Sequence, residues 1–284
     1  MTKSHVIALH CSGGNARQWR ALSQTLGRRV WAPDFIGSRA TGHWGGEHPF
    51  TLADEAAPVI SMLDALSAPV HLVGHSYGGA VALKVACARP AQVASLALYE
   101  PTPLHVLKAA GPDAQTVLAG VAAISAEIDR AVLAGDHRTA ARAMVEYWNE
   151  PGAWAAMRED VQADMIRYVP KACLDFRAVV SERTPLAAYR HLRCPALVMQ
   201  GEHAHEAAQV ATRQIGRALR FASLRTVFGA GHMGPLTHAE TVTAMLAEFI
   251  RRQDGDDMAQ GDMEQGDMEQ AVEQCADGAL DRAA

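Results

Sequence analysis

The chain has 284 residues, a length that at roughly 150 residues per domain holds one large domain or two small ones. Its residues are 49% hydrophobic and 20% charged, which is typical of a globular protein and excludes a fibrous, wholly disordered or integral membrane chain. The formal net charge of −5 offers no basic surface, so we expect no nucleic-acid partner.

The five cysteines are widely spaced and contain no C-x-x-C, so they predict neither a disulfide framework nor a zinc knuckle. The apolar run from Val6 to Leu9 is too short for a signal peptide, and no apolar run reaches transmembrane length. We therefore expect a cytoplasmic protein with reduced thiols and no membrane partner.

The first third of the chain alternates short strand-like runs with helical stretches. Strands are predicted at 5–9, 29–32, 70–73 and 93–99, and helices at 17–26, 52–66 and 80–88. This alternation predicts βαβ units, and hence an α/β fold with a mostly parallel sheet covered by helices on both faces.

Residues 101–192 instead show Ala-rich segments with apolar residues at three- and four-residue intervals, which indicates helices. Strands then resume at 194–200 and 223–228, with helices at 207–218 and 235–252. The sheet frames the helical block on both sides. We therefore predict a core formed by residues 1–100 and 193–253, with an inserted helical cap at 101–192.

Residues 254–284 are predicted to form a disordered acidic tail. They hold ten Asp and Glu against one Arg, and Gly261-Asp-Met-Glu-Gln265 is repeated at 266–270. A segment so poor in apolar residues cannot offset its ordering entropy by burial. Without the tail the chain is mildly basic, so the overall charge says little about the substrate. Truncation after Arg252 is expected to leave catalysis intact.

Gly74-His-Ser-Tyr-Gly78 matches G-x-S-x-G, directly after a predicted strand and before a predicted helix. Glycines permit a sharp turn, from which a serine hydroxyl projects beyond the sheet edge at a helix N-terminus. Ser76 is therefore predicted to be a nucleophile. The alternative is an inert serine in a Gly-rich turn.

Together with this motif, three more segments resemble the α/β-hydrolase family over about residues 4–252. They are Leu9-His-Cys-Ser-Gly-Gly14, Pro33-Asp-Phe-Ile-Gly37 and Gly231-His-Met-Gly234. The resemblance implies the serine-nucleophile branch with a helical cap, and chemistry without a cofactor. It also implies an oxyanion hole made by the backbone N–H groups of Ser12 and Tyr77.

A serine hydroxyl needs a base, because it is hardly ionised at neutral pH. Among 13 histidines, His232 is favoured because its Gly-flanked loop between the last strand and the last helix can reach back over the sheet edge. The alternative is an ordinary loop histidine. For His75, a structural hydrogen bond is the preferred interpretation.

The sequence departs from the family in the position of the acidic residue that would orient His232. Most members place an Asp in a Gly-x-x-Asp turn after the next-to-last strand, but here Gly201-Glu-His-Ala204 ends in alanine. Some members carry the acid at the end of the strand beside the nucleophile's strand, where this chain has Glu100. We prefer Glu100, with Glu202, Glu206 or no acid as the alternatives.

His203, His205 and Glu206 have spacing that could bind zinc, but no further ligand is evident and we expect no metal. Substrate-binding candidates are Trp44, Trp148 and Met233. Further candidates to line the pocket, with helix packing as the alternative use for the aromatic ones, are Arg17, His43, Tyr147, Trp154 and Tyr168.

The sequence predicts a serine hydrolase that forms an acyl-enzyme with a small-molecule substrate, and the apolar composition of the predicted cap favours an acyl group with an apolar body. The resemblance to the family implies that the bond cleaved is an ester or thioester. Two alternatives stay open. The same residues could serve acyl transfer, carbon–carbon bond hydrolysis or cofactor-free lyase chemistry, or the chain could be a non-catalytic binding relative. The oligomeric state is not predicted.

Overall fold

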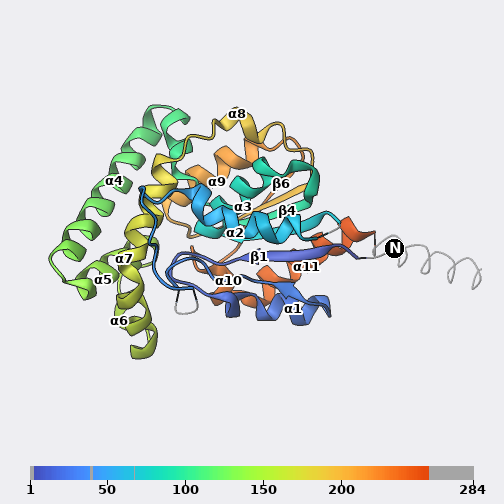
Figure 1. Ribbon diagram of the computed structural model, residues 1–284. Helices are drawn as coiled ribbons and strands as arrows, with labels where there is room; N and C mark the ends of the chain where they lie inside the picture. The colour runs from blue at the N-terminus through green and yellow to red at the C-terminus, as the bar shows by residue number, and fades with distance from the viewer. Residues whose placement is uncertain (1–2, 39–40, 67, 256–284) are drawn as a thin grey trace, which may run out of the picture.

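The computed structural model describes residues 3–38, 41–66 and 68–255, and its strands form one parallel sheet (Figure 1). The strand order is β2-β1-β3-β4-β5-β6. The strands are β1 (His5–Leu9), β2 (Val30–Trp31), β3 (Val70–His75), β4 (Val93–Tyr99), β5 (Ala196–Gly201) and β6 (Ala222–Val227). The prediction of a parallel sheet flanked by helices is confirmed.

Helices cover both faces of the sheet, which explains why its central strands are buried and mainly apolar. Along β3, for example, Leu72 packs into one hydrophobic core and Val73 into the other. The first core lies under α2 (Leu52–Asp64), α3 (Tyr77–Ala88) and α9 (Glu206–Ala218), and the second under α1 (Arg20–Leu26) and α11 (Ala239–Asp254). Short 3₁₀ turns, η1 (Ala16–Trp19) and η2 (Pro90–Gln92), precede α1 and β4.

The helical insertion between β4 and β5 lies at one end of the sheet, drawn in green to yellow (Figure 1). Its long helices α4 (Pro112–Leu133), α5 (His137–Trp148) and α7 (Glu159–Ser181) pack on one another. The shorter elements are η3 (Leu104–Ala109), α6 (Ala153–Ala156) and α8 (Leu186–Tyr189). In the described part of the chain, each helix is too short or too polar to cross a bilayer.

The single helix expected at 235–252 is divided in two. α10 (Gly234–Thr237) ends at His238, whose φ of −124° and ψ of 42° are not helical, and α11 begins at the next residue. This short first helix turns the chain just after the loop that carries His232.

Asp254 does not belong to a tail, because it is the last residue of α11 and is buried. Its carboxylate accepts a hydrogen bond from Arg28 Nη2 at 2.6 Å and lies 3.0 Å from His71 Nε2. Burial alone would raise the pKa of Asp254, but the hydrogen bonds and charges of His71 and Arg28 outweigh it and lower that pKa. The rest of the predicted tail, residues 256–284, lies outside the described residues.

Asp254→Ala is expected to lower the free energy of unfolding by about 3 kcal/mol, because it leaves Arg28 and His71 without their buried acceptor. Truncation after Arg252 removes the same acceptor and should cost as much stability. Urea denaturation measures this loss. The control is Glu248→Ala, which removes an exposed acid of the same helix and should cost less than about 1 kcal/mol. Equal losses in the two variants would contradict the role of Asp254.

Candidate active site

Ser76 occupies a strained turn between β3 and α3. Its φ of 54° and ψ of −118° are rare for a residue with a side chain, and its amide donates to the Tyr99 carbonyl at 3.0 Å. A Cβ on Gly78 would lie 2.4 Å from the carbonyl oxygens of Leu9 and His10, and one on Gly74 would lie 2.6 Å from the Gly78 oxygen. Both motif positions therefore require glycine, and the turn presents the Ser76 hydroxyl at the start of α3.

Ser76, His232 and Glu100 form a continuous chain of hydrogen bonds. His232 Nε2 lies 2.9 Å from Ser76 Oγ, and His232 Nδ1 lies 2.6 Å from Glu100 Oε2. All three side chains are buried. A carboxylate at Nδ1 holds the ring proton there, which leaves Nε2 free to accept the proton of the serine hydroxyl.

Glu100 reaches the histidine from the end of β4. Its amide donates to the Met199 carbonyl at 2.8 Å, and its φ of 42° turns the chain sharply out of the sheet. The second carboxylate oxygen, Oε1, accepts the Gly201 amide at 2.7 Å. Both oxygens are thus held, and the carboxylate is oriented toward the imidazole.

The two alternative acids lie elsewhere. Glu202 Oε2 accepts the Gly229 amide at 2.8 Å, and its side chain is 45% exposed. Glu206 is the first residue of α9 and is exposed. The carboxylate that the structure places against His232 is that of Glu100.

The loop that carries His232 is fixed from beneath by two buried side chains. His75 Nε2 lies 2.8 Å from the His232 carbonyl, and His75 Nδ1 lies 3.1 Å from Gln18 Nε2. Tyr99 donates its hydroxyl to the Gly231 carbonyl at 2.8 Å. Burial first, and then the neighbouring His232, lower the pKa of His75 to about 3, so this ring is a neutral support and not a second base.

The backbone N–H groups of Ser12 and Tyr77 are available to a ligand, since neither has an acceptor among the described residues. Both residues border the space beside Ser76 Oγ. The loop before Ser12 is held by the buried His10 ring, whose Nδ1 lies 2.7 Å from the Cys11 carbonyl and whose Nε2 accepts the Phe35 amide at 3.3 Å. These amides can stabilise a negatively charged oxygen.

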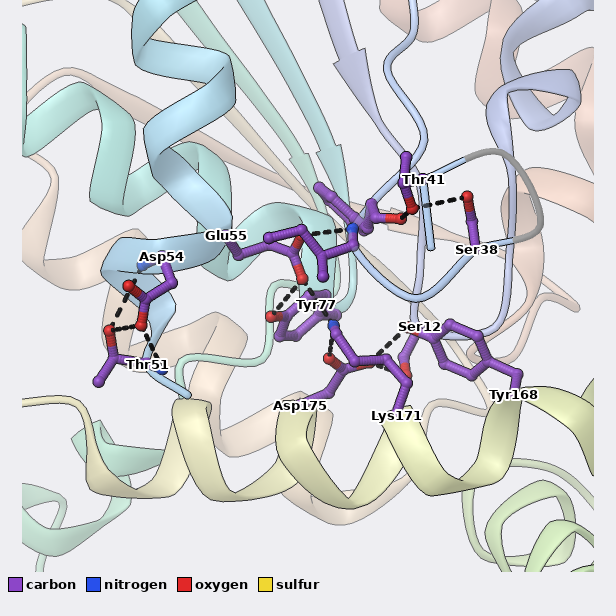
Figure 2. A network of polar contacts seen from close by, with 12 residues as sticks. Ser12, Ser38, Thr41, Thr51, Asp54, Glu55, Tyr77, Tyr168, Lys171 and Asp175 are labelled. Carbon is purple, nitrogen blue, oxygen red and sulfur yellow. Dashed lines mark hydrogen bonds and ion pairs between the residues drawn. The ribbon is translucent and has the colours of Figure 1, made fainter. Parts of the chain in front are cut away.

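A buried ionic cluster lies beneath these two amides (Figure 2). Lys171 of α7 donates to Glu55 Oε2 of α2 at 2.6 Å and also to Asp175, one turn further along α7. All three side chains are almost fully buried. The two carboxylates more than offset the burial of the ammonium and raise the pKa of Lys171, so it stays charged.

The same cluster holds the side chains of both residues that carry the free amides. Ser12 Oγ donates to Asp175 Oδ2 at 2.6 Å, and the Tyr77 hydroxyl donates to Glu55 Oε2 at 3.0 Å (Figure 2). The cluster therefore connects the cap helix α7 to the amides beside Ser76. The sequence analysis missed it, although a Lys and an Asp four residues apart on the apolar side of α7 were a signal of buried pairing.

A large cavity of about 610 Å³ opens beside Ser76 under the cap. His232, Trp148 and Met233 line it, and the Trp148 ring stacks on the His232 ring at 4.8 Å between centroids. Arg17 also lines it. The helical insertion thus covers the edge of the sheet at Ser76 and supplies part of the wall.

The prediction that Trp44 binds the substrate is wrong, because this residue lines neither the large cavity nor the small space beside Ser76 and Tyr77. Its indole packs on Phe50 at 5.2 Å between ring centroids and donates to the His48 carbonyl. His43 is exposed on the same loop. Trp44 therefore packs against the hydrophobic core instead of lining the cavity.

The remaining candidates have structural roles. The Tyr168 hydroxyl donates to Asp175 at 2.6 Å, and Trp154 is buried in the cap. The Tyr147 ring packs at a tilt against the His205 ring, and His205 Nδ1 accepts the Ala207 amide at the start of α9. In the part of the chain that the structure describes, no three His, Cys, Asp or Glu side chains gather as metal ligands would.

The geometry brings a serine, a histidine and a glutamate into one hydrogen-bonded chain at the carboxyl ends of parallel strands, beneath the helical insertion. A family model described as "Alpha/beta hydrolase family" matches residues 6–245. The chain belongs to this family.

The similar proteins include two curated relatives that match only in part. A segment of 100 residues is 36% identical to lipase LipV of Mycobacterium tuberculosis and covers 34% of this chain and 37% of that protein. Another of 92 residues is 41% identical to the putative carbamate hydrolase RutD of Variovorax paradoxus and covers 30% of this chain and 34% of that one.

Among solved structures, a hydrolase from Pseudomonas aeruginosa PA01 covers far more of the chain. It superposes with a TM-score of 0.69 over 87% of this chain and 90% of that one, at 24% identity. This similarity shows the shared fold.

Proposed function

We propose that the protein is a serine hydrolase that cleaves an ester or thioester of a small-molecule substrate through an acyl-enzyme. The observation that carries the proposal is the buried hydrogen-bonded chain from Ser76 through His232 to Glu100. The names lipase and carbamate hydrolase of two partial relatives agree with acyl hydrolysis. The free amides beside Ser76 and the large cavity under the cap support it further.

In the first half of the reaction, Ser76 Oγ attacks the acyl carbon while His232 Nε2 accepts the hydroxyl proton. The Glu100 carboxylate stabilises the imidazolium, and the amides of Ser12 and Tyr77 donate to the oxyanion. The bond to the leaving group then breaks, and His232 returns the proton to that group. An acyl ester remains on Ser76.

In the second half, water attacks the acyl-enzyme and gives its proton to His232. The ester bond to Ser76 breaks, the serine recovers its proton, and the acid leaves. The cavity and the arrangement of Ser76 favour this two-step reaction over ligand binding alone. A protein that only binds a ligand would need no strained serine in contact with a histidine–carboxylate pair.

A fluorophosphonate that carries a small alkyl group tests the proposal. We expect the wild-type chain to gain one covalent adduct by intact mass spectrometry and Ser76→Ala to gain none. Ser61→Ala, which changes an exposed serine of α2, is the control and should label like the wild type. A wild-type chain that stays unlabelled, or a Ser76→Ala variant that labels equally, would exclude the proposed nucleophile.

A further inference from the structure

The lining of the large cavity has an apolar part and a polar part. The apolar part comes mainly from the cap, where α5, α6 and α7 supply side chains such as Met144, Trp148 and Met165. The polar part comes largely from the segment 11–18, which includes Ser12 and Arg17. A substrate that matches both parts is mainly apolar and carries a polar group as well.

Most polar side chains of this lining already have partners within the protein. Ser76 and His232 hydrogen bond to each other. The other uncharged polar side chains with a nitrogen or oxygen also hydrogen bond within the chain, and they are Ser12, Asn15, Gln18, Asn149 and Thr237. These groups are engaged before a ligand arrives.

Arg17 differs from all of them. Its backbone amide donates to Asn15 Oδ1 at 3.0 Å, but its guanidinium has no hydrogen bond or ion pair with any residue that the structure describes. The side chain is exposed, and no Asp or Glu is among the described residues that line the cavity. Because arginine stays protonated, the cavity carries one fixed positive charge without a counter-charge in its described lining.

The chemistry of the guanidinium selects the group that it would bind. Its planar donors match a carboxylate or a phosphate, which they hold through two parallel hydrogen bonds. Among the described lining residues, Arg17 is the only Lys or Arg, so a phosphate dianion would keep an uncompensated charge. A singly charged carboxylate is therefore the better match.

We propose that the substrate is an ester or thioester with an apolar chain that ends in a carboxylate, and that Arg17 binds this carboxylate. The inference rests on the proposed serine hydrolase function and adds a charged end to the expected apolar body. Water is consumed at the acyl bond, which breaks into an acid and an alcohol or thiol. The carboxylate at Arg17 takes no part in bond making or breaking.

Ser12 and Arg17 would fix two points of such a substrate. Both belong to the segment 11–18, where Gln18 Oε1 accepts the Cys11 amide at 3.4 Å. The amide of Ser12 binds the acyl oxygen and Arg17 binds the carboxylate, so the length of the chain between these two groups matters. We expect the preference for a carboxylate to peak at one chain length in a series of linear substrates.

Two pairs of esters test the assignment. In the first pair, the acyl chain of a 4-nitrophenyl ester ends in a carboxylate or in a carboxamide, which has nearly the same shape without the charge. In the second pair, the same two groups end the alcohol chain of a butanoate ester. We expect kcat/KM to favour the carboxylate about tenfold in at least one pair, which identifies the half of the substrate that carries the charge. Equal rates in both pairs at every chain length would overturn the proposal.

Variants of Arg17 assign the preference to its charge. Arg17→Gln should lower the ratio of carboxylate to carboxamide turnover to about one, mainly through a higher KM for the carboxylate ester, because the contact lies away from the reacting atoms. Arg17→Lys retains the charge and should keep part of the ratio. Arg20→Gln changes an exposed arginine of α1 outside the cavity and should behave like the wild type. A ratio that survives Arg17→Gln, or falls equally in Arg20→Gln, would contradict the role of Arg17.

Labelling of Ser76 tests the same contact without turnover. Of two fluorophosphonates with the same alkyl chain, the one that ends in a carboxylate should label the wild type about tenfold faster than the one that ends in a carboxamide. The difference should shrink at high salt, because Arg17 is exposed, and disappear in Arg17→Gln. If both reagents label Ser76 at the same rate, the role of Arg17 is wrong while the nucleophile stands. If neither labels Ser76, the proposed function fails and the substrate assignment fails with it.

Discussion

Glu100→Gln is expected to lower kcat by about 10⁴-fold while the protein stays folded. Glutamine retains an oxygen that can accept the Gly201 amide, so the local backbone keeps its support. Its NH₂ group then faces His232 Nδ1, which must act as an acceptor. The ring proton moves to Nε2, where it blocks proton transfer from Ser76.

The loss should appear in kcat at saturating ester, with KM little changed, because Glu100 does not line the large cavity beside Ser76. Steady-state kinetics and thermal unfolding of the same sample check both parts of the expectation. The matched control is Glu202→Gln in the other candidate loop, whose carboxylate contacts Gly229 and His203 instead. Near-normal turnover in Glu100→Gln, or a severe loss in Glu202→Gln, would move the acid to that loop.

Lys171→Met is expected to lower the free energy of unfolding by about 4 kcal/mol at pH 8, since it leaves Glu55 and Asp175 buried without their cation. Activity should also fall, by about tenfold or more, because the side chains of Ser12 and Tyr77 hydrogen bond to these two carboxylates. Urea denaturation and ester hydrolysis measure the two effects. Lys108→Met, which changes an exposed lysine of η3, should alter stability by less than about 0.5 kcal/mol.

The stability loss in Lys171→Met should depend on pH. Burial already raises the pKa of Glu55 in the wild type, and loss of the ammonium raises it further. A carboxyl group with a raised folded-state pKa binds more protons in the folded than in the unfolded chain, so stability falls as pH rises between the two values. The deficit relative to wild type should therefore be smaller at pH 5 than at pH 8.

A second substitution keeps this prediction testable if the single variant folds poorly. Asp175→Asn in the Lys171→Met background removes one of the two unpaired charges and is expected to recover about half of the lost stability. A deficit that is independent of pH and of Asp175 would show that Lys171 acts through packing alone.

The sequence by itself determined the features that depend on short segments. Alternating apolar runs and helical stretches specified the parallel sheet, because period and spacing are local properties. The turn around Ser76 was also predictable from a short segment, since close backbone contacts at Gly74 and Gly78 exclude any side chain there. His232 followed from its place on a Gly-flanked loop between a strand and a helix.

Tertiary structure alone decided which distant side chains meet. Glu100 and Glu202 were both possible partners for His232, and the turn at the end of β4 brings the first one within 2.6 Å. Asp254 looked like part of an acidic tail until the end of α11 placed it against Arg28 and His71. Pairing between residues far apart in the chain depends on how the helices and strands pack, so a local sequence pattern does not predict it.

The buried cluster of Glu55, Lys171 and Asp175 and the position of Trp44 have the same origin. Glu55 and Lys171 lie 116 positions apart, and only the docking of α7 on α2 brings them together. The large cavity beside Ser76 likewise forms where α5, α6 and α7 close over the sheet. The sequence specified the reactive groups, whereas packing of the cap on the sheet decided their partners and the space around them.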